Sequence, residues 1–236
     1  MIGVILAAGK GSRLGNYTVD LPKSLLPLDN EKTLLDYNLK LLEKLDLKKI
    51  IIITGFNSGK IENHVSGYRN IEIIYNPFWD SCNVLGSLYM ALDKINDDFL
   101  FLHADTLADK EIWDQLVEAK GEMVLPYERK QCVEEEMKIL MKDNTIIEIS
   151  KEIDSNKADG EFLGIAKFSK STIPFFKSKA EQLFKKGNLN HYMESIIQCA
   201  IDEGKFDISV MDILDYNFVE VDFEEDYIRA KSEFGK

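Results

Sequence analysis

The sequence predicts an α/β fold, in which a sheet is packed between helices. Two features of the first half lead to this prediction, namely apolar runs of strand length and amphipathic segments of helical period between them. The predicted strands are Ile2–Leu6, Ile50–Thr54, Ile71–Tyr75, Phe99–Leu102 and Met123–Leu125. They are rich in Ile, Val and Phe and do not alternate with polar residues, which is typical of strands buried on both faces of a parallel sheet.

The predicted helices of the first half lie between these strands. Thr33–Leu47 carries leucines that fall mostly on one stripe of a helix. These are Leu34, Leu35, Leu39, Leu41, Leu42 and Leu45. Val84–Ile95 carries a second such stripe. Alternation of strand and helix predicts βαβ units.

The pattern changes after about residue 126. Two strands joined by a turn at Asp143-Asn144 are predicted first, and a third strand, two helices, a strand and a short helix follow. Their ranges are Met137–Met141, Thr145–Ser150, Phe162–Phe168, Ser171–Lys186, Asn190–Glu203, Phe218–Asp222 and Glu224–Phe234. We find no internal repeat and no linker, so we expect a single domain over residues 1–236, with residues 127–236 packed on the same core.

Composition narrows the classes of function. The chain has 236 residues, of which 45% are hydrophobic, and 41 acidic against 29 basic side chains give a formal net charge of −12. Such a charge disfavours a nucleic acid polymer as partner. Cys82, Cys132 and Cys199 form no C-x-x-C pair, which argues against a disulfide scaffold or a zinc site. The N-terminal apolar run Ile2–Ala8 is too short for a signal peptide, and we expect a soluble cytoplasmic protein without membrane contacts.

The most informative segment directly follows the first strand. It reads Leu6-Ala7-Ala8-Gly9-Lys10-Gly11-Ser12-Arg13-Leu14-Gly15. Small residues let the backbone approach a ligand closely, successive N–H groups can form an anion site, and Arg13 adds a planar cation suited to phosphate. The third glycine comes one residue late for a dinucleotide-binding fingerprint, and the P-loop pattern does not fit either. The alternative is a structural turn that binds no ligand.

A lysine with rigid neighbours lies shortly downstream. Lys23 stands between Pro22 and Pro27 in the segment LPKSLLPL. Prolines limit backbone motion, so Lys23 is expected at a fixed place. A lysine in a loop is otherwise most often solvated, but this one lies near the glycine segment.

The segments LAAGKGSRL and LPKSLLPL together resemble the nucleotidyltransferase family, whose members join a nucleoside monophosphate to a phosphorylated acceptor and release pyrophosphate. The family signature L-A-A-G-x-G-x-R-L followed by P-K is present without a gap, and similar blocks continue almost to the C-terminus. The resemblance implies a doubly wound, mixed and mostly parallel sheet of Rossmann-like type, with a small α+β insertion for the acceptor. It also implies that residues 1–126 bind the nucleotide and residues 127–236 bind the acceptor and complete the sheet.

The resemblance assigns roles to particular positions. It implies that Leu6–Arg13 bind the nucleotide, with Gly9–Arg13 wrapped around its phosphates. It also implies that Arg13 and Lys23 neutralise charge around the α-phosphate and the leaving pyrophosphate. Asn83 and Ser87 resemble the pattern of cytidylyltransferases that act on phosphocholine and on phosphonates such as 2-aminoethylphosphonate. Their side chains can hydrogen-bond a pyrimidine edge, but the same two residues can also begin a helix.

Two aspartates match the metal ligands of the family. Asp105 follows the central strand, although the family more often shows a glycine-rich triplet where this chain has His103-Ala104. Asp222 in Val-Glu-Val-Asp matches the second ligand. Both follow apolar strands, from which a carboxylate can reach a shared cleft and hold Mg²⁺. From the residues alone, each is also compatible with a helix N-cap.

Later blocks resemble the same branch and imply acceptor contacts. Lys151 is expected to meet the acceptor phosphate, and Glu161 to face its polar or cationic end. Tyr192 and Glu194 are expected to line the acceptor pocket, since an aromatic face and a carboxylate suit an ammonium group. Tyr192 is also compatible with a place in the core, and Glu194 with a solvated surface.

We therefore expect an Mg²⁺-dependent cytidylyltransferase that transfers CMP from CTP to a small phosphorylated or phosphonate acceptor. The acceptor is already anionic, so in-line attack needs positioning and charge neutralisation rather than a strong general base. The alternatives are a UTP- or dTTP-dependent sugar-1-phosphate nucleotidyltransferase and, from a different class, a catalytically inactive nucleotide-binding module. A nicotinamide dehydrogenase fits less well. The sequence leaves the acceptor open, and the Thr33–Leu47 helix is compatible with a homodimer interface.

Overall fold

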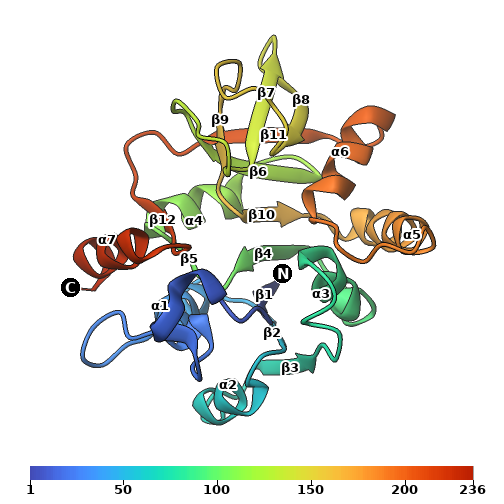
Figure 1. The fold of residues 1–236 in the computed structure, drawn as a ribbon. Helices are drawn as coiled ribbons and strands as arrows, with labels where there is room; N and C mark the ends of the chain where they lie inside the picture. Colours follow the sequence, from blue (N-terminus) through green and yellow to red (C-terminus); the bar gives the residue numbers. More distant parts are fainter. Residues whose placement is uncertain (236) are drawn as a thin grey trace.

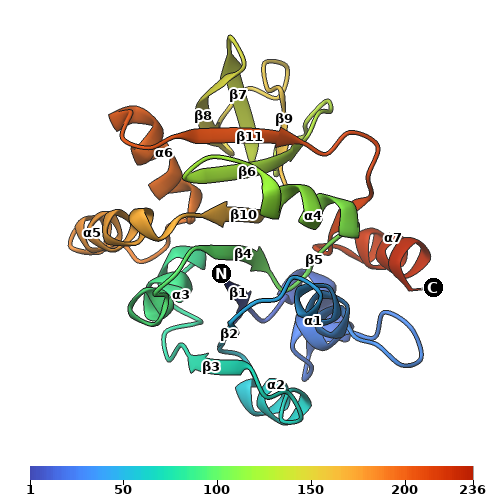
Figure 2. The same cartoon turned by 180° about the vertical axis from the view of Figure 1, so that it is seen from behind.

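A computed structural model describes residues 1–235, and a ten-stranded sheet with helices on both faces forms its centre (Figures 1 and 2). The strand order is β3-β2-β1-β4-β10-β6-β9-β7-β8, and β11 pairs with β6. Its strands are β1 (Ile2–Ala7), β2 (Lys49–Thr54), β3 (Ile71–Tyr75), β4 (Phe99–His103), β6 (Met123–Glu128), β7 (Lys138–Lys142), β8 (Thr145–Ser150), β9 (Gly160–Phe162), β10 (Ile165–Phe168) and β11 (Ile208–Asp212). A separate two-stranded sheet joins β5 (Thr106–Ala108) to β12 (Phe218–Glu220).

The large sheet is mixed and mostly parallel, as the sequence predicts. Strands β3, β2, β1 and β4 are parallel neighbours. β10 runs antiparallel between β4 and β6, so β6 points the same way as β4, and β11 is parallel to β6. The carboxyl ends of these strands therefore open toward one edge, where ligands bind in doubly wound folds.

Helices cover the two faces of the sheet and explain its unbroken apolar strands. They are α1 (Leu34–Glu43), α2 (Ser58–His64), α3 (Val84–Ala91), α4 (Lys110–Glu118), α5 (Ile173–Phe184), α6 (Glu194–Glu203) and α7 (Glu224–Phe234). Short 3₁₀ helices are η1 (Ser12–Thr18), η2 (Lys23–Leu25), η3 (Leu92–Lys94) and η4 (Lys170–Thr172). Within β4, Phe99 and Phe101 pack into the core under α3, α5 and α6, whereas Leu100 and Leu102 pack into the core under α1, α2 and α4. No helix of residues 1–235 is long and apolar enough to cross a membrane.

One predicted strand is divided in the structure. Residues 162–168 were expected to form a single strand, but β9 ends at Phe162 and β10 begins at Ile165. Gly164 between them has φ +71°, a left-handed conformation that interrupts an extended chain. Leu163 donates its N–H to Pro126 O at 3.2 Å, so the two short strands run along different parts of β6.

Other predicted elements agree with the structure except at their ends. The hairpin β7–β8 turns at Asp143 and Asn144, whose φ values of +51° and +63° are typical of a tight two-residue turn. The predicted helix Asn190–Glu203 begins only at Glu194. The elements α2, α4, β5 and β11 were not predicted from the sequence.

The C-terminal segment returns to the N-terminal loop. Tyr227, Ala230 and Phe234 of α7 pack in a third core with Leu14 and Leu26. Figure 1 shows α7 beside the connection from β4 to β5. This packing brings the end of β12 to the carboxyl end of β4.

Candidate active site

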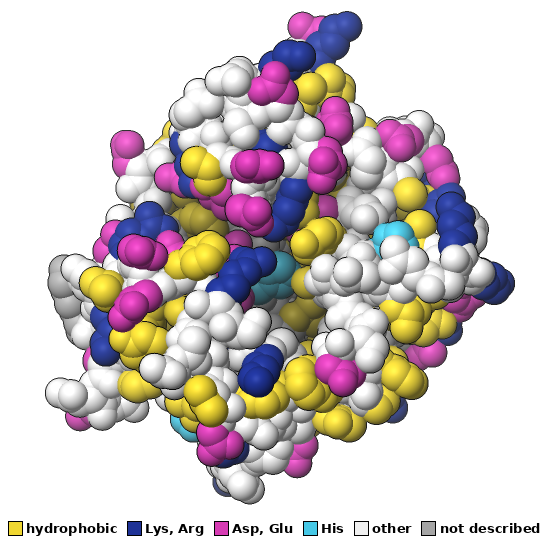
Figure 3. Space-filling view, viewed as in Figure 1, with side chains coloured by type: hydrophobic (Ala, Val, Ile, Leu, Met, Phe, Trp, Pro, Cys, Tyr) yellow, Lys and Arg dark blue, Asp and Glu magenta, His cyan; other side chains and the backbone are white. Residues whose placement is uncertain are grey.

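A cavity of about 660 Å³ opens at the carboxyl ends of β1 and β4. Figure 3 shows a hollow near the centre of this face, with acidic and basic side chains around it. The predicted site residues that line the cavity are Leu6, Ala7, Ala8, Gly9, Gly11, Ser12, Arg13, Lys23, Asn83, Ser87, Asp105, Lys151, Glu161, Tyr192, Glu194 and Asp222. Lys10 is exposed outside this lining, and its Nζ lies 5.4 Å from the ring centroid of Phe56.

The glycine loop is held in shape by its own backbone and by Lys23. Gly11 has φ +68°, and a Cβ placed there would lie 2.9 Å from the Cβ of Lys23, so a larger residue would displace that side chain. The Gly11 carbonyl accepts the hydroxyl of Thr18 at 2.7 Å and the N–H of Leu14 at 3.1 Å. Gly9 has open space beside it, which leaves room for a ligand against the loop.

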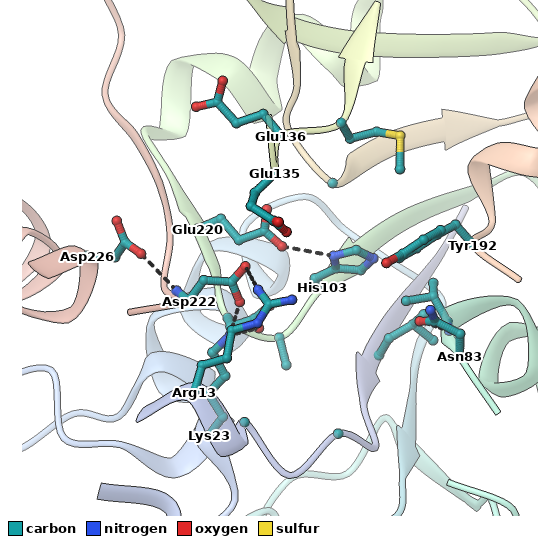
Figure 4. Close-up of a pocket in the computed structure, with 18 of the residues that line it drawn as sticks. Arg13, Lys23, Asn83, His103, Glu135, Glu136, Tyr192, Glu220, Asp222 and Asp226 are labelled. Carbon is teal, nitrogen blue, oxygen red and sulfur yellow. Dashed lines mark hydrogen bonds and ion pairs between the residues drawn. The ribbon is translucent and has the colours of Figure 1, made fainter. Parts of the chain in front are cut away.

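Two cations and two carboxylates meet beside this loop (Figure 4). Lys23 Nζ lies 2.5 Å from Asp105 Oδ2 and 2.8 Å from Asp222 Oδ1. Arg13 donates from Nη1 to Asp222 Oδ2 at 2.7 Å. The structure therefore brings together at the cavity the four charged residues that were predicted to form one cluster. They are Arg13, Lys23, Asp105 and Asp222.

The charges of this cluster shift the pKa values of Lys23 and Asp222. Burial disfavours the charged form of Lys23, but Asp105 and Asp222 outweigh burial and raise the pKa of the ammonium above its ordinary value. Burial also disfavours the ionised form of Asp222, but Lys23 and Arg13 outweigh it and hold the pKa of that carboxyl below its ordinary range. Lys23 and Asp222 are thus both charged at neutral pH.

The backbone around Asp222 is fixed by the start of α7. Asp226 accepts the N–H groups of Asp222 at 3.1 Å and of Phe223 at 2.8 Å, which caps the helix (Figure 4). Val221 donates its N–H to Asp105 O at 3.1 Å. This bond ties the segment carrying Asp222 to the end of β4.

His103 and Glu220 also belong to the site, although the sequence analysis assigned them no role. His103 Nδ1 lies 3.5 Å from Glu220 Oε1 (Figure 4). Burial would lower the pKa of the imidazole, but Glu220 and, to a lesser extent, Asp105 raise it to about 9. Gly164 lies against the ring, since a Cβ there would be 3.1 Å from Nδ1. Alternate residues of a strand point to the same side, so in Val-Glu-Val-Asp the side chains of Glu220 and Asp222 share one side. This alternation is the signal in the sequence that could have identified Glu220.

The carboxylate and imidazole groups at this end of β4 could act as ligands of a divalent cation. Ligand atoms of His103, Asp105 and Glu220 lie within 4.8 Å of one another. Asp105 and Asp222 offer carboxylate oxygens, which Mg²⁺ prefers. The ammonium of Lys23 already lies between these two carboxylates, so the position attracts a cation.

The two residues expected at the pyrimidine line the cavity and also have structural roles. Asn83 begins α3, and its Oδ1 accepts the N–H of Val84 at 2.8 Å. Ser87 is buried, and its Oγ lies 3.1 Å from Asn76 Nδ2. The helix-start interpretation is therefore confirmed for Asn83, and a contact with a base stays a prediction.

On the acceptor side, Glu161 is paired with a lysine that the sequence analysis did not identify. Lys130 Nζ lies 2.6 Å from Glu161 Oε2 and 2.7 Å from Glu136 Oε1. Burial raises the pKa of Glu161 to about 7 despite this ion pair. Lys130 and Glu136 lie on an irregular loop, where no periodicity in the sequence marks them as site residues.

The loop that carries Lys130 and Glu136 is anchored by a buried lysine. Lys138 is 1% exposed, and its Nζ donates to the carbonyls of Val133 at 3.3 Å, Glu134 at 2.8 Å and Glu136 at 3.2 Å. Three donors thus meet three acceptors. Because Glu136 also accepts the N–H of Val133 at 2.7 Å, the loop is held over the acceptor side.

The remaining acceptor-side residues differ in their surroundings. Lys151 Nζ lies 5.3 Å from the ring centroid of Tyr192, which is 38% exposed and therefore not a core residue. Glu194 is only 4% exposed, so the solvated-surface interpretation is wrong. Burial is also the main reason that the pKa of Glu194 is raised.

Comparisons with known proteins agree with this geometry. A family model described as a MobA-like NTP transferase domain matches residues 3–168. A CTP:phosphoglutamine cytidylyltransferase from Campylobacter jejuni is 25% identical, with 96% of this chain and 97% of that protein aligned. A choline-phosphate cytidylyltransferase from Streptococcus pneumoniae is 23% identical, with 96% and 95% aligned. These matches confirm the expected resemblance to nucleotidyltransferases and to their cytidylyltransferase branch.

A solved structure supports the fold assignment. The inositol-1-phosphate CTP transferase from T. maritima matches with a TM-score of 0.78 at 19% identity, over 98% of this chain and 94% of that chain. At this identity the match shows the fold alone. It agrees with the mixed, mostly parallel sheet described above.

Proposed function

This chain belongs to the MobA-like NTP transferase family, and from that membership we propose that it transfers CMP from CTP to a small phosphorylated or phosphonate acceptor. The observation that carries the proposal is the cluster at the glycine loop, where Lys23 joins Asp105 to Asp222 and Arg13 pairs with Asp222. Two side-chain cations at this position suit a triphosphate, and two carboxylates suit the metal ion that accompanies it.

The reaction balances without a general base. An oxygen of the anionic acceptor attacks the α-phosphorus and forms a new P–O bond, while the bond from that phosphorus to the bridging oxygen of the β-phosphate breaks. The electron pair leaves with pyrophosphate. Arg13 and Lys23 neutralise the charge that develops on the phosphoryl oxygens, and the glycine loop orients the phosphate chain.

We propose that Asp105 and Asp222 hold Mg²⁺. When bound, the ion would supply charge neutralisation at the phosphoryl oxygens. Lys23 would then share the two carboxylates with the ion and extend its ammonium toward the phosphates. Glu220 lies beside Asp105 and His103 and offers a further oxygen.

The finer substrate assignments are proposed from the cavity lining. Asn83 and Ser87 line the cavity, and both can donate and accept hydrogen bonds, which supports the proposal that they contact a pyrimidine edge. Lys151 offers a cation to the acceptor's phosphoryl group. The relatives from C. jejuni and S. pneumoniae are both named as cytidylyltransferases of small phosphorylated acceptors, which supports this substrate class.

A substrate panel tests the proposal. Purified chain with Mg²⁺ is mixed with CTP, UTP, dTTP, ATP or GTP and with phosphocholine, phosphoethanolamine, 2-aminoethylphosphonate, phosphoglutamine, inositol 1-phosphate or glucose 1-phosphate. Pyrophosphate release is expected with CTP and a non-sugar acceptor. Preference for UTP or dTTP with glucose 1-phosphate would instead favour a sugar-phosphate enzyme. CTP binding in calorimetry without turnover of any acceptor would indicate a nucleotide-binding module.

A further inference from the structure

A buried carboxylate on the acceptor side of the cavity has one oxygen without a hydrogen-bond partner in the described part of the chain. Glu194 is the first residue of α6, lines the cavity and is 4% exposed. Its Oε2 has no hydrogen-bond partner among residues 1–235. An unsatisfied buried polar group is costly in a folded protein, so such an oxygen on a cavity wall points to a ligand that donates to it.

The neighbouring cations do not supply that donor. His103 has the largest electrostatic effect on Glu194 of the charged neighbours, but its Nδ1 lies beside Glu220 and its Nε2 has no hydrogen-bond partner among the described residues. Lys130 is paired with Glu136 and Glu161. Lys151 lies over the ring of Tyr192. Neither lysine forms an ion pair with Glu194 in the described part of the chain.

The balance of charge on this side favours a cationic ligand group. Glu220 and His103 also line the cavity and pair with each other. Apart from that pair, the cavity wall carries four glutamates here, and two lysines oppose them. The glutamates are Glu135, Glu136, Glu161 and Glu194, and the lysines are Lys130 and Lys151. A ligand that brings a positive charge is therefore stabilised, whereas a neutral hydroxyl or amide would leave the excess of carboxylates uncompensated.

The aromatic surface here does not suit a quaternary ammonium. Such a group has no N–H, and proteins bind it on the faces of aromatic rings. The face of Tyr192 is already covered by the ammonium of Lys151. Phe162, the other aromatic side chain on this part of the wall, is 1% exposed.

We propose that the acceptor of this enzyme carries a primary ammonium group, which donates a hydrogen bond to Glu194 Oε2, and that a quaternary ammonium is discriminated against. This inference rests on the proposed function and refines its substrate class. The acceptor's anionic end would be a phosphate or a phosphonate, and Lys151 would lie between the two ends.

The test compares acceptors that differ only in methylation or in the anionic group. With CTP and Mg²⁺, kcat/KM is measured for phosphoethanolamine, 2-aminoethylphosphonate, phosphocholine and inositol 1-phosphate. We expect one of the two primary amines to exceed phosphocholine by about 10-fold or more, roughly the effect of one hydrogen bond to a charged group. The comparison of phosphate with phosphonate shows which anionic end is used.

A variant links the preference to Glu194. Glu194→Gln keeps the shape but removes the charge, and it should lower kcat/KM for the primary amine about 10-fold or more while the KM for CTP stays unchanged. Glu203→Gln, at the exposed far end of the same helix, is the control and should leave both constants unchanged.

The outcomes separate this inference from the proposed function. Equal or better use of phosphocholine or inositol 1-phosphate would overturn the inference and leave the cytidylyltransferase activity intact. An equal effect of Glu194→Gln on phosphocholine and on the primary amine would also overturn it. Release of pyrophosphate with none of these four acceptors and with none of the other acceptors in the substrate panel would instead reject the proposed function.

Discussion

The ammonium nitrogen of Lys23 lies 2.5 Å from Oδ2 of Asp105 and thereby joins the loop after the glycine segment to the end of β4. Both side chains are largely buried, with 10% and 21% exposure. A bound triphosphate would compete with Asp105 for the same ammonium. The ion pair therefore both holds these two segments together and takes part in binding the substrate. Two predictions follow from its place in the site.

The first prediction concerns the charge of Asp105. Asp105→Asn keeps the size of the side chain but removes a charge from the cluster, so kcat should fall by about 100-fold or more, while the affinity for CTP changes little. Lys23 keeps Asp222 as a partner, so the variant should remain folded. Pyrophosphate release measures kcat, calorimetry measures the affinity for CTP, and the thermal midpoint of unfolding shows whether the variant is folded.

The matched control for this variant is Asp93→Asn, because Asp93 is 76% exposed and its ion-pair partner among residues 1–235 is Lys177 at the surface. It should leave turnover unchanged. Lys23→Ala should also abolish most of the turnover. Near-normal pyrophosphate release in Asp105→Asn or Lys23→Ala would show that the cluster does not perform the chemistry.

The second prediction concerns the divalent ion. Chelation with EDTA should lower turnover by about 100-fold or more, because several kcal/mol of charge stabilisation are lost, and added Mg²⁺ should restore it. Asp222→Asn should need a higher Mg²⁺ concentration for half-maximal turnover, since one charged ligand is removed. Titration of activity with Mg²⁺ in both proteins measures this shift. Full activity in EDTA would reject the assignment of Asp105 and Asp222 as metal ligands.

The central strands of the large sheet could be predicted well because both of their faces are buried. Ile50–Thr54 and Phe99–Leu102 agree with β2 and β4 to within one residue at each end. The prediction for Phe162–Phe168 was wrong because apolar residues continue through Gly164, and only the left-handed φ of that glycine divides the strand. β11 was missed because its residues are only partly buried and have no continuous apolar character.

The site could be predicted where a short pattern carries the chemistry, as in the glycine loop and Lys23. Contacts between distant segments could not be predicted from the residues alone. The ion pair of Lys130 with Glu161 depends on the path of an irregular loop, and that path depends on the buried ammonium of Lys138. His103 was noted only as a departure from the family pattern, although Gly164 leaves room for its ring.

The third prediction concerns this anchoring lysine. Lys138→Met removes the ammonium and leaves the carbonyls of Val133, Glu134 and Glu136 without their donor. We expect a loss of roughly 1–3 kcal/mol in the free energy of unfolding, the usual effect of unsatisfied buried polar groups. Because the loop holds Lys130 beside Glu161, the KM for the acceptor should rise while the KM for CTP stays the same.

Lys142→Met is the matched control for Lys138→Met, since Lys142 lies at the exposed end of the same strand. It should change neither stability nor either KM. If Lys138→Met raises both KM values equally, the lysine supports the fold generally and does not position the acceptor loop.

The fourth prediction concerns the pH dependence of stability that Glu161 causes. Burial outweighs the attraction of Lys130 and raises the pKa of Glu161 from 4.5 to about 7. Between these values the folded protein binds more protons at this site than the unfolded chain, so its free energy of unfolding falls as the pH rises from 4.5 to about 7. Above about pH 7 the contribution is constant.

Glu161→Gln removes this dependence. We expect the stability of the wild type relative to the variant to fall through the same window, by on the order of 3 kcal/mol, since one pKa unit corresponds to about 1.4 kcal/mol. Urea denaturation at a series of pH values measures the difference, and Glu128→Gln controls for the loss of a charge near Lys130. A difference that rises with pH would mean that the ion pair with Lys130 outweighs burial, and that Glu161 meets the acceptor as a carboxylate well below neutral pH.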